Sequence, residues 1–230
     1  MEQKKEVGQL IEVDAALESM RNSGHDLSTA VGEVVDNAID AGGRAVKIET
    51  GFVKGKTKEI TQMAFSDNGT GISPSILPHV LTLGYSSNHN QRTLLGRFGM
   101  GLKVASISQA RRVEIYTRQI GGEIHHTHID LTEIREHKQT CIVEEEVKGY
   151  PLQYKYLMCD EKGEEYPSGT LVIWSKIDRL VNQGKYSSSL DKKIGDLLDF
   201  LARAYRRFLA QGLKIYLDGK LVDPYDPLFL

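Results

Sequence analysis

Acidic, amide and glycine residues of this chain fall into three short segments whose order could build a nucleotide pocket. The first is GEVVDNAIDAGG, in which Glu33 and Asn37 lie four residues apart. The second is DNGTG at 67–71, and the third is GRFGMG at 96–101. A carboxylate can act as a general base, an amide oxygen can bind a cation, and glycine loops expose backbone N–H groups to phosphates. Together the segments predict a nucleotide-binding site.

The segment that carries the first two residues is predicted to be a helix from Asp26 to Ala41. Asp26 can cap its N-terminus, and two glycines follow its last residue. Glu33, Asn37 and Asp40 follow an i, i+4, i+7 spacing, so they share one face, while valines and alanines occupy another. The polar face either lines the site or faces water.

The rest of the chain predicts a sheet with helices. Strands are expected at 44–53 and 60–67 as one hairpin, at 111–119 and 123–131 as another, at 141–147, 152–160 and 169–178, and in a hairpin at 213–223. One helix is expected to begin at Ser73-Pro74, and a second to run from Gly99 to Ala110. A third is expected from Leu190 to Leu209, with core residues Leu197, Leu198, Leu201, Tyr205 and Phe208. The polar stretch at 84–97 suits a lid loop. This pattern predicts an α+β fold, a two-layer sandwich whose mixed, mostly antiparallel sheet carries helices on one face.

Composition limits the class of protein. The chain has 230 residues, 40% hydrophobic and 26% charged, which is ordinary for one large globular domain. A net charge of -2 gives no nucleic-acid footprint over the whole chain. No apolar run is long enough to predict a membrane span, so we expect the cytoplasm or, in a eukaryote, the nucleus. Cys141 and Cys159 lack CxxC spacing and are expected to be free thiols.

Other glycine fingerprints do not fit. Leu102 separates Gly101 from Lys103, so the third segment is not a P-loop. Pro74 and Val104 stand where a dinucleotide fingerprint needs its third glycine. The catalytic-loop and metal-binding signatures of protein kinases are also missing from the sequence.

The ordered set E-x-x-x-N, D-x-G-x-G and G-x-x-G-x-G, with a later Gly169-Thr170, resembles the GHKL ATPases. That superfamily includes gyrase, the heat-shock chaperone ATPase, histidine kinases and MutL. The longer phrases EVVDNAIDA, FSDNGTGIS and GRFGMGLK are most similar to its MORC, MutL and chaperone branch. The resemblance runs from about Asp26 to Ile177 and implies a Bergerat-type ATP-binding fold that hydrolyses ATP with Mg²⁺.

The resemblance implies roles for the polar helix face. Glu33 would be the general base that activates water, and Asn37 would be a Mg²⁺ ligand through its amide oxygen. Asp40 would support the ribose or the lid side of the pocket. For these residues the alternatives are a solvated glutamate, an asparagine bonded to backbone, and a salt-bridged aspartate.

It also implies an adenine site. Asp67 would accept the exocyclic amine of adenine, and Gly69 and Gly71 would let the backbone approach the ring. Thr170, at a strand start, would share hydrogen bonds with Asp67 and the edge of the base. The alternative for Asp67 is an ordinary Asp-Asn-Gly turn.

The phosphates would lie on the third segment. Gly96, Gly99 and Gly101 would offer backbone N–H groups at a helix N-terminus. Lys103, and Arg97 from the lid, would add positive charge, or would simply be solvated side chains.

For a pair of histidines and a group of three arginines, an ordinary structural role is favoured over a functional one. His126 and His128 share a strand face and could bind zinc, but no matching ligand is predictable, so a surface or core role is favoured. Arg203, Arg206 and Arg207 could touch DNA or a neighbouring domain, but an exposed charged helix face is favoured.

We therefore expect residues 1–25 to form an N-terminal strap or extension and residues 26–230 an ATPase domain cut from a longer protein. The first hypothesis is an ATP-driven clamp, in which ATP orders the lid and drives homodimerisation. We expect that a downstream transducer-like domain is missing from this chain. The expected partner is DNA or a client protein, and no membrane is involved. Turnover would be slow, because a γ-phosphate contact would come from the next domain. The alternatives are a histidine-kinase-like phosphotransferase, which needs an acceptor helix pair upstream, and a nucleotide sensor with little turnover.

Overall fold

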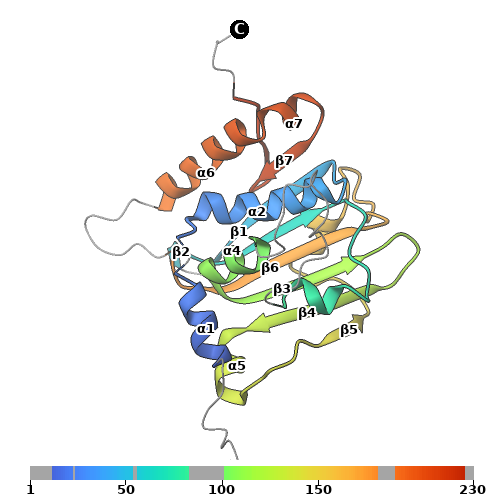
Figure 1. Cartoon of the computed structure of the whole chain (residues 1–230). Coiled ribbons are helices and arrows are strands. Elements are labelled where there is room, and N and C mark those ends of the chain that lie inside the picture. The colour runs from blue at the N-terminus through green and yellow to red at the C-terminus, as the bar shows by residue number, and fades with distance from the viewer. Residues whose placement is uncertain (1–11, 23, 54–55, 83–100, 181–189, 226–230) are drawn as a thin grey trace, which may run out of the picture.

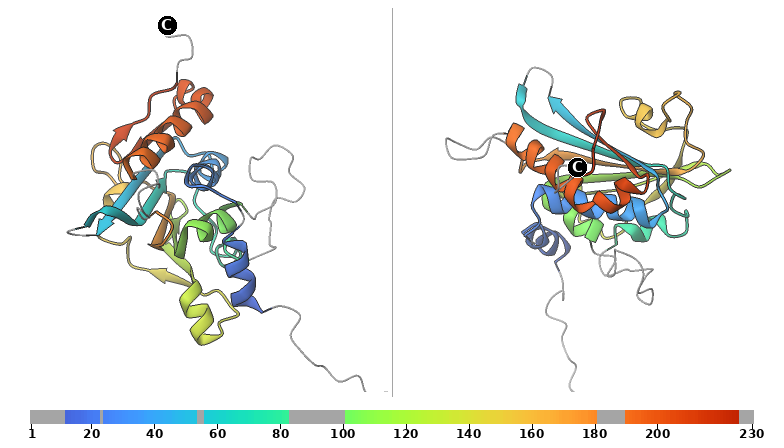
Figure 2. Two further views of the ribbon diagram at one scale, coloured as in Figure 1. Left: turned by 90° about the vertical axis from the view of Figure 1, so that its left-hand side faces the viewer. Right: turned by 90° about the horizontal axis from the view of Figure 1, so that it is seen from above.

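The computed structural model describes residues 12–22, 24–53, 56–82, 101–180 and 190–225. Within them, one twisted sheet carries helices on one face, as the views in Figures 1 and 2 show. The sheet is mixed and mostly antiparallel, which confirms the predicted α+β sandwich.

Eight strands form the described sheet, in the order β5-β4-β3-β6-β2-β1-β7-β8. Their bounds are β1 Ala45–Val53, β2 Lys56–Asp67, β3 Ala110–Arg118, β4 Ile124–Asp130, β5 Glu144–Val147, β6 Gly169–Ile177, β7 Lys214–Leu217 and β8 Lys220–Leu221. Only β1 and β7 run parallel among these pairs. The predicted hairpins β1–β2, β3–β4 and β7–β8 are confirmed. The strand expected at 141–147 is shorter at its start.

The described helices are α1 Val13–Met20, α2 Leu27–Asp40, α3 Leu77–Val80, α4 Gly101–Gln109, α5 Leu131–His137, α6 Leu190–Ala204 and α7 Arg206–Ala210, with a 3₁₀ helix η1 at Lys155–Met158. Helix α2 lies over the sheet beside α4, and α6 packs next to α2 (Figure 1). None of the described helices is long and apolar enough to cross a membrane. Cys141 and Cys159 are free thiols.

Helix α2 begins and ends as its sequence predicts. The Asp26 side chain accepts a hydrogen bond from the Thr29 amide at 2.8 Å, which caps the N-terminus. Gly42 follows with a φ of +77°, a conformation that favours glycine. The helix therefore presents its residues to the sheet in a fixed register.

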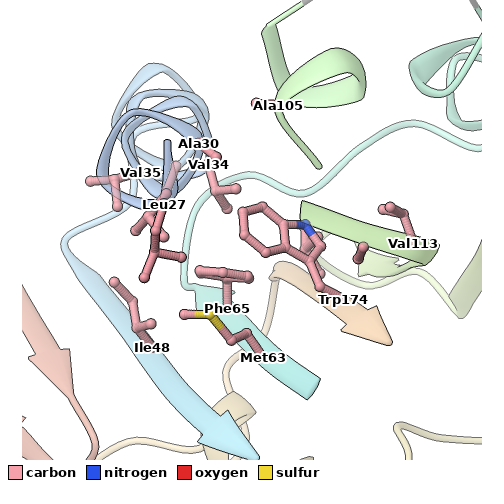
Figure 3. Close-up of a cluster of buried hydrophobic side chains, with 14 of the residues drawn as sticks. Leu27, Ala30, Val34, Val35, Ile48, Met63, Phe65, Ala105, Val113 and Trp174 are labelled. Atoms are coloured by element: carbon pink, nitrogen blue, oxygen red, sulfur yellow. The ribbon is translucent and has the colours of Figure 1, made fainter. Parts of the chain in front are cut away.

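The main core lies between α2 and the sheet. Figure 3 shows Leu27, Val34 and Val35 of α2 above Ile48, Met63 and Phe65 of the first hairpin and Trp174 of β6. The Phe65 and Trp174 rings meet at 4.5 Å between centroids. Each such buried side chain contributes about 1.5–3 kcal/mol. This packing holds α2 over β1, β2 and β6.

The second face of the sheet has a smaller core, and here one prediction was wrong. Residues 152–160 do not form a strand: they contain a turn and the helix η1. Tyr154, Leu157 and Met158 pack on Ala64 and Leu171, on the face away from α2. The spacing of these three anchors suits a helical turn, and Tyr154 N–H donates to the Pro151 carbonyl to begin it.

Two helix predictions also need correction. No helix opens at Ser73-Pro74; a turn covers 74–76 and α3 begins at Leu77, kept short around Pro78. The last long helix is interrupted at Tyr205, which separates α6 from α7. Leu198 is 40% exposed and does not belong to the core.

Candidate nucleotide-binding site

A cavity of about 340 Å³ opens between α2, the sheet and the chain that follows β2. Its apolar wall includes Val34 and Ala38 of α2, Phe65 of β2 and Val172 of β6. Its polar lining consists of Asn37, Ser66, Asp67, Ser73, Gln119 and Thr170. A mostly apolar cavity with a few polar groups is typical of small-molecule sites. Four residues that the sequence assigned to the nucleotide line it: Asn37, Asp67, Gly71 and Thr170.

Asp67 ends β2 and its carboxyl is buried in the cavity wall. One carboxyl oxygen accepts the Gly69 N–H at 2.8 Å. Burial raises the pKa of Asp67 to about 7, while the backbone amides of Gly69 and Thr170 act in the opposite direction. A carboxyl group with this pKa changes its charge near neutral pH, and its ionised form would accept a hydrogen bond from a ligand amine.

The chain after Asp67 approaches its neighbours so closely that it needs its glycines. A Cβ on Gly69 would lie 2.8 Å from the Ala41 carbonyl oxygen. Gly71 has a φ of +72°, and a Cβ there would lie 2.1 Å from the Arg118 carbonyl oxygen. The glycines therefore bring this loop against the end of α2 on one side and against β3 on the other.

Thr170 lies opposite Asp67 in the β2–β6 register, at the start of β6. It lines the cavity and is largely buried. The preceding Gly169 has a φ of +147°, and a Cβ there would lie 2.1 Å from the Asp67 carbonyl oxygen. The Gly-Thr pair thus allows β6 to begin directly beside Asp67.

Glu33 projects from α2 toward the first residue of α4. A Cβ on Gly101 would lie 1.9 Å from Glu33 Oε2, so position 101 must be glycine for this contact. Burial, and then the charge of Asp36, raise the pKa of Glu33 above its usual value. A half-buried carboxylate with a raised pKa is a stronger base than a solvated one.

Asn37, one turn after Glu33, lines the cavity and is exposed. Its side-chain nitrogen donates to the Glu33 backbone carbonyl. That bond leaves the amide oxygen Oδ1 as the acceptor, which is the atom type that Mg²⁺ prefers. The two interpretations of Asn37 are therefore compatible: its nitrogen bonds to the backbone, and its oxygen could bind a cation.

Two other predicted residues, Asp40 and Lys103, are not part of the cavity lining. Asp40 is half-buried in the last turn of α2. Lys103 is buried, and its ammonium donates to the Thr82 carbonyl. Burial lowers the pKa of Lys103 to about 8. Lys103 is therefore not the solvated lysine of the ordinary interpretation.

Part of the predicted site lies outside the described residues. Gly96, Arg97 and Gly99, and the lid predicted at 84–97, fall in the segment 83–100. Of the third motif, Gly101 is described, at the start of α4.

Several residues that support the site were not singled out from the sequence. The Asn68 side chain accepts the Arg44 and Ala45 amides at 2.7 and 2.9 Å, which joins the loop to the start of β1. The Ser168 hydroxyl donates to the Gly69 carbonyl at 2.8 Å. Asn and Ser are common in turns, so only the position of Asn68 within DNGTG could have indicated its role.

The histidine and arginine groups lie away from the cavity lining. His126 and His128 stack with 5.5 Å between ring centroids, on the sheet face away from α2. Among the described residues, no group of three histidine, cysteine or acidic side chains could hold a metal ion. Arg203, Arg206 and Arg207 are exposed.

A family model described as "Histidine kinase-, DNA gyrase B-, and HSP90-like ATPase" matches residues 25–163, more than half of the chain. The chain belongs to this family. The match starts just before α2 and includes the segments with Glu33, Asn37 and Asp67. The GHKL resemblance is confirmed, and this family supports ATP binding and hydrolysis as the general activity.

Individual relatives agree with this membership. Protein MICRORCHIDIA 1 of Arabidopsis thaliana is 32% identical over 97 residues, which are 40% of this chain and 15% of that protein. Protein MICRORCHIDIA 3 of the same plant has the same identity over the same length, with 16% of that protein covered. A subunit of the type 2 DNA topoisomerase 6 of Sulfurisphaera tokodaii is 32% identical over 117 residues, 46% of this chain and 22% of that protein. The matches thus span less than a quarter of each relative, and they support the MORC side of the GHKL superfamily.

Proposed function

We propose that this GHKL domain binds ATP in the cavity beside α2 and hydrolyses it with Glu33 as the general base. Adenine would lie against Asp67 and Thr170, and the phosphates would extend past Asn37 toward the start of α4. The observation that carries the proposal is the meeting of Asn37, Asp67 and Thr170, from three separate elements, at one cavity. Glu33 is held one turn from Asn37 against Gly101.

At the adenine end, the ionised Asp67 carboxylate would accept the exocyclic amine. The apolar wall from Val34, Phe65 and Val172 would cover the faces of the ring. Asp67 is already held by the Gly69 amide, so its side chain needs little reorganisation on binding.

At the phosphate end, Asn37 would hold Mg²⁺ through Oδ1. The bound ion would offset the negative charge of the phosphates. Gly96, Gly99 and Gly101 would donate backbone N–H groups, and Arg97 and Lys103 would supply positive charge. Asp40 would support the ribose or the lid side.

Glu33 would take a proton from water as the water oxygen bonds to the γ-phosphorus. The bond between that phosphorus and the ADP oxygen breaks, and ADP leaves with the electron pair. The raised pKa of Glu33 favours this transfer, because the proton moves to a base stronger than an ordinary glutamate.

We further propose a clamp cycle in which ATP closes the 84–97 segment and drives homodimerisation. Residues 1–25 would be the strap and 26–230 the ATPase domain, which would turn over slowly as an isolated domain. We propose DNA as the partner of this cycle, because one relative is a DNA topoisomerase subunit. A client protein is the alternative, and cytoplasm or nucleus stays our prediction for the compartment.

Three measurements test the proposal. Steady-state hydrolysis of Mg-ATP should be saturable and slow, and fast hydrolysis by the monomer would contradict the clamp. Sedimentation with a non-hydrolysable ATP analogue should give a dimer, whereas a monomer at saturating analogue would overturn dimerisation. Incubation with γ-labelled ATP should leave the protein unlabelled; a stable acid-labile phosphoprotein would favour the phosphotransferase instead.

A further inference from the structure

Thr117, near the end of β3, belongs to none of the three sequence motifs and is fully buried. It lies opposite Thr170 in the β3–β6 register. The next residue, Arg118, has the carbonyl oxygen against which Gly71 packs. The end of β3 therefore supports both sides of the proposed adenine site.

The Thr117 hydroxyl makes three short contacts. The Ile72 amide donates to Oγ1 at 2.8 Å, from the loop that lines the cavity. Oγ1 lies 3.1 Å from the Gly169 carbonyl oxygen and 3.2 Å from the Thr170 hydroxyl oxygen. Thr117 thus joins the loop after β2 to the start of β6.

The number of protons decides the direction of these bonds. A hydroxyl has one proton to donate and two lone pairs to accept. A carbonyl oxygen can only accept, so Gly169 must receive the Thr117 proton if that bond forms. All three contacts are hydrogen bonds at once only if Thr117 accepts from Ile72 and from the Thr170 hydroxyl. In this arrangement the Thr170 proton points to Thr117, and the Thr170 lone pairs are left for the cavity.

We infer that Thr117 is a positioning residue that makes Thr170 a hydrogen-bond acceptor, so that the cavity selects a purine with a 6-amino group over one with a 6-oxo group. This inference rests on the proposed adenine site. An acceptor beside Asp67 matches an amine, whereas a 6-oxo group would leave two acceptors facing each other. Discrimination by a buried polar group is strong, because the wrong ligand leaves that group unpaired.

The test compares ATP with inosine triphosphate, which has a 6-oxo group, by calorimetric titration of the whole 230-residue chain. Thr117→Val keeps the side-chain shape but removes the hydroxyl. We expect it to reduce the ratio of ATP to inosine triphosphate affinity about tenfold. Thr117→Ser keeps the hydroxyl and should retain the wild-type ratio. If Thr117→Val does not fold, Thr117→Cys offers a side chain of similar size with a weak acceptor and gives the same comparison.

The matched control is Thr127→Val. Thr127 is also a fully buried strand threonine, but its hydroxyl donates to the Val143 carbonyl at 2.8 Å. Thr127→Val should keep the wild-type ratio of ATP to inosine triphosphate affinity, even if it lowers the melting temperature. A purely structural change weakens the binding of both nucleotides to the same extent. A wild-type ratio in Thr117→Val would overturn the inference and leave the ATP site intact. If the unmodified chain binds neither nucleotide, the proposed function itself fails.

Discussion

The Glu33 carboxylate and Gly101 lie in such close contact that a methyl group at position 101 would be 1.9 Å from Glu33 Oε2. This contact joins two of the three motifs, since Glu33 belongs to α2 and Gly101 begins α4. The glycine at this position therefore has a second role beside any contact with phosphate: it leaves space for the proposed base.

Glu33→Ala should keep ATP binding and lose hydrolysis. The side chain acts on water rather than on the nucleotide, so we expect turnover to fall about 10²–10⁴-fold. Calorimetry should find an ATP affinity close to that of the unmodified chain. Loss of binding along with turnover would mean that Glu33 has a structural role instead.

Gly101→Ala should displace the Glu33 carboxylate, because the new methyl group occupies its place. The end of a flexible side chain can move, so stability should change little while turnover falls at least tenfold. The control is a double-mutant cycle: in a Glu33→Ala background, Gly101→Ala should have little further effect on hydrolysis. Additive losses would show that Gly101 acts through the phosphates alone.

Asp67 should make adenine binding depend on pH. Burial raises its pKa to about 7, so the free carboxyl is protonated below that pH and must lose its proton to become a charged acceptor. ADP affinity should therefore rise as pH increases from about 6 to 8, with release of a proton on binding. The matched variant is Asp67→Asn, which should bind ADP much more weakly and without this pH dependence. Undiminished affinity in that variant would mean that the base lies elsewhere.

Gly71→Ala should damage the adenine side of the site. Its φ of +72° disfavours alanine, and the new Cβ would lie 2.1 Å from a backbone oxygen, which cannot move aside as a side chain can. We expect at least a tenfold loss of ATP affinity in titration. Gly149→Ala is the control, because a Cβ there meets no atom within 4 Å. Equal affinities of the two variants would contradict the proposed position of this loop.

Tyr205→Phe should loosen α6 from α2. The Tyr205 hydroxyl lies 2.7 Å from Asp36 Oδ1 and 2.9 Å from the Gly32 carbonyl oxygen. Its one proton is donated preferentially to the ionised Asp36 carboxylate, whose pKa burial raises. Loss of this hydrogen bond should cost about 1–3 kcal/mol in the free energy of unfolding. The cost should be larger at pH 7 than at pH 4. A protonated, neutral Asp36 carboxyl loses less free energy than an ionised one when the hydroxyl donor is removed. Tyr225→Phe, at an exposed tyrosine, should have little effect in the same denaturant titrations.

Local sequence signals predicted the elements whose ends carry caps or turns. Asp26 and the glycines after α2 fixed that helix, and Asp218-Gly219 predicted the last hairpin, where both residues have positive φ. Residues 152–160 were misassigned because tyrosines and leucines in this stretch look like strand residues. Their true conformation depends on Ala64 and Leu171, which are distant in sequence.

The same limit applies to the site. Glu33, Asn37 and Asp67 could be proposed from the sequence because they occur in motifs with glycines at fixed spacing. Thr117 gave no signal, since a threonine in an alternating strand is ordinary. Its contacts with Ile72 and Thr170 exist only because β3 and β6 pair in the folded sheet.

The central claim is that the three motifs together bind adenosine triphosphate. Its most direct test is calorimetric titration of the 230-residue chain with ATP and Mg²⁺, using a non-hydrolysable analogue so that hydrolysis adds no heat. The account predicts saturable binding with one nucleotide per chain, and much weaker binding to Asp67→Asn. A titration of the unmodified, folded chain that gives no binding with either ATP or the analogue would contradict it.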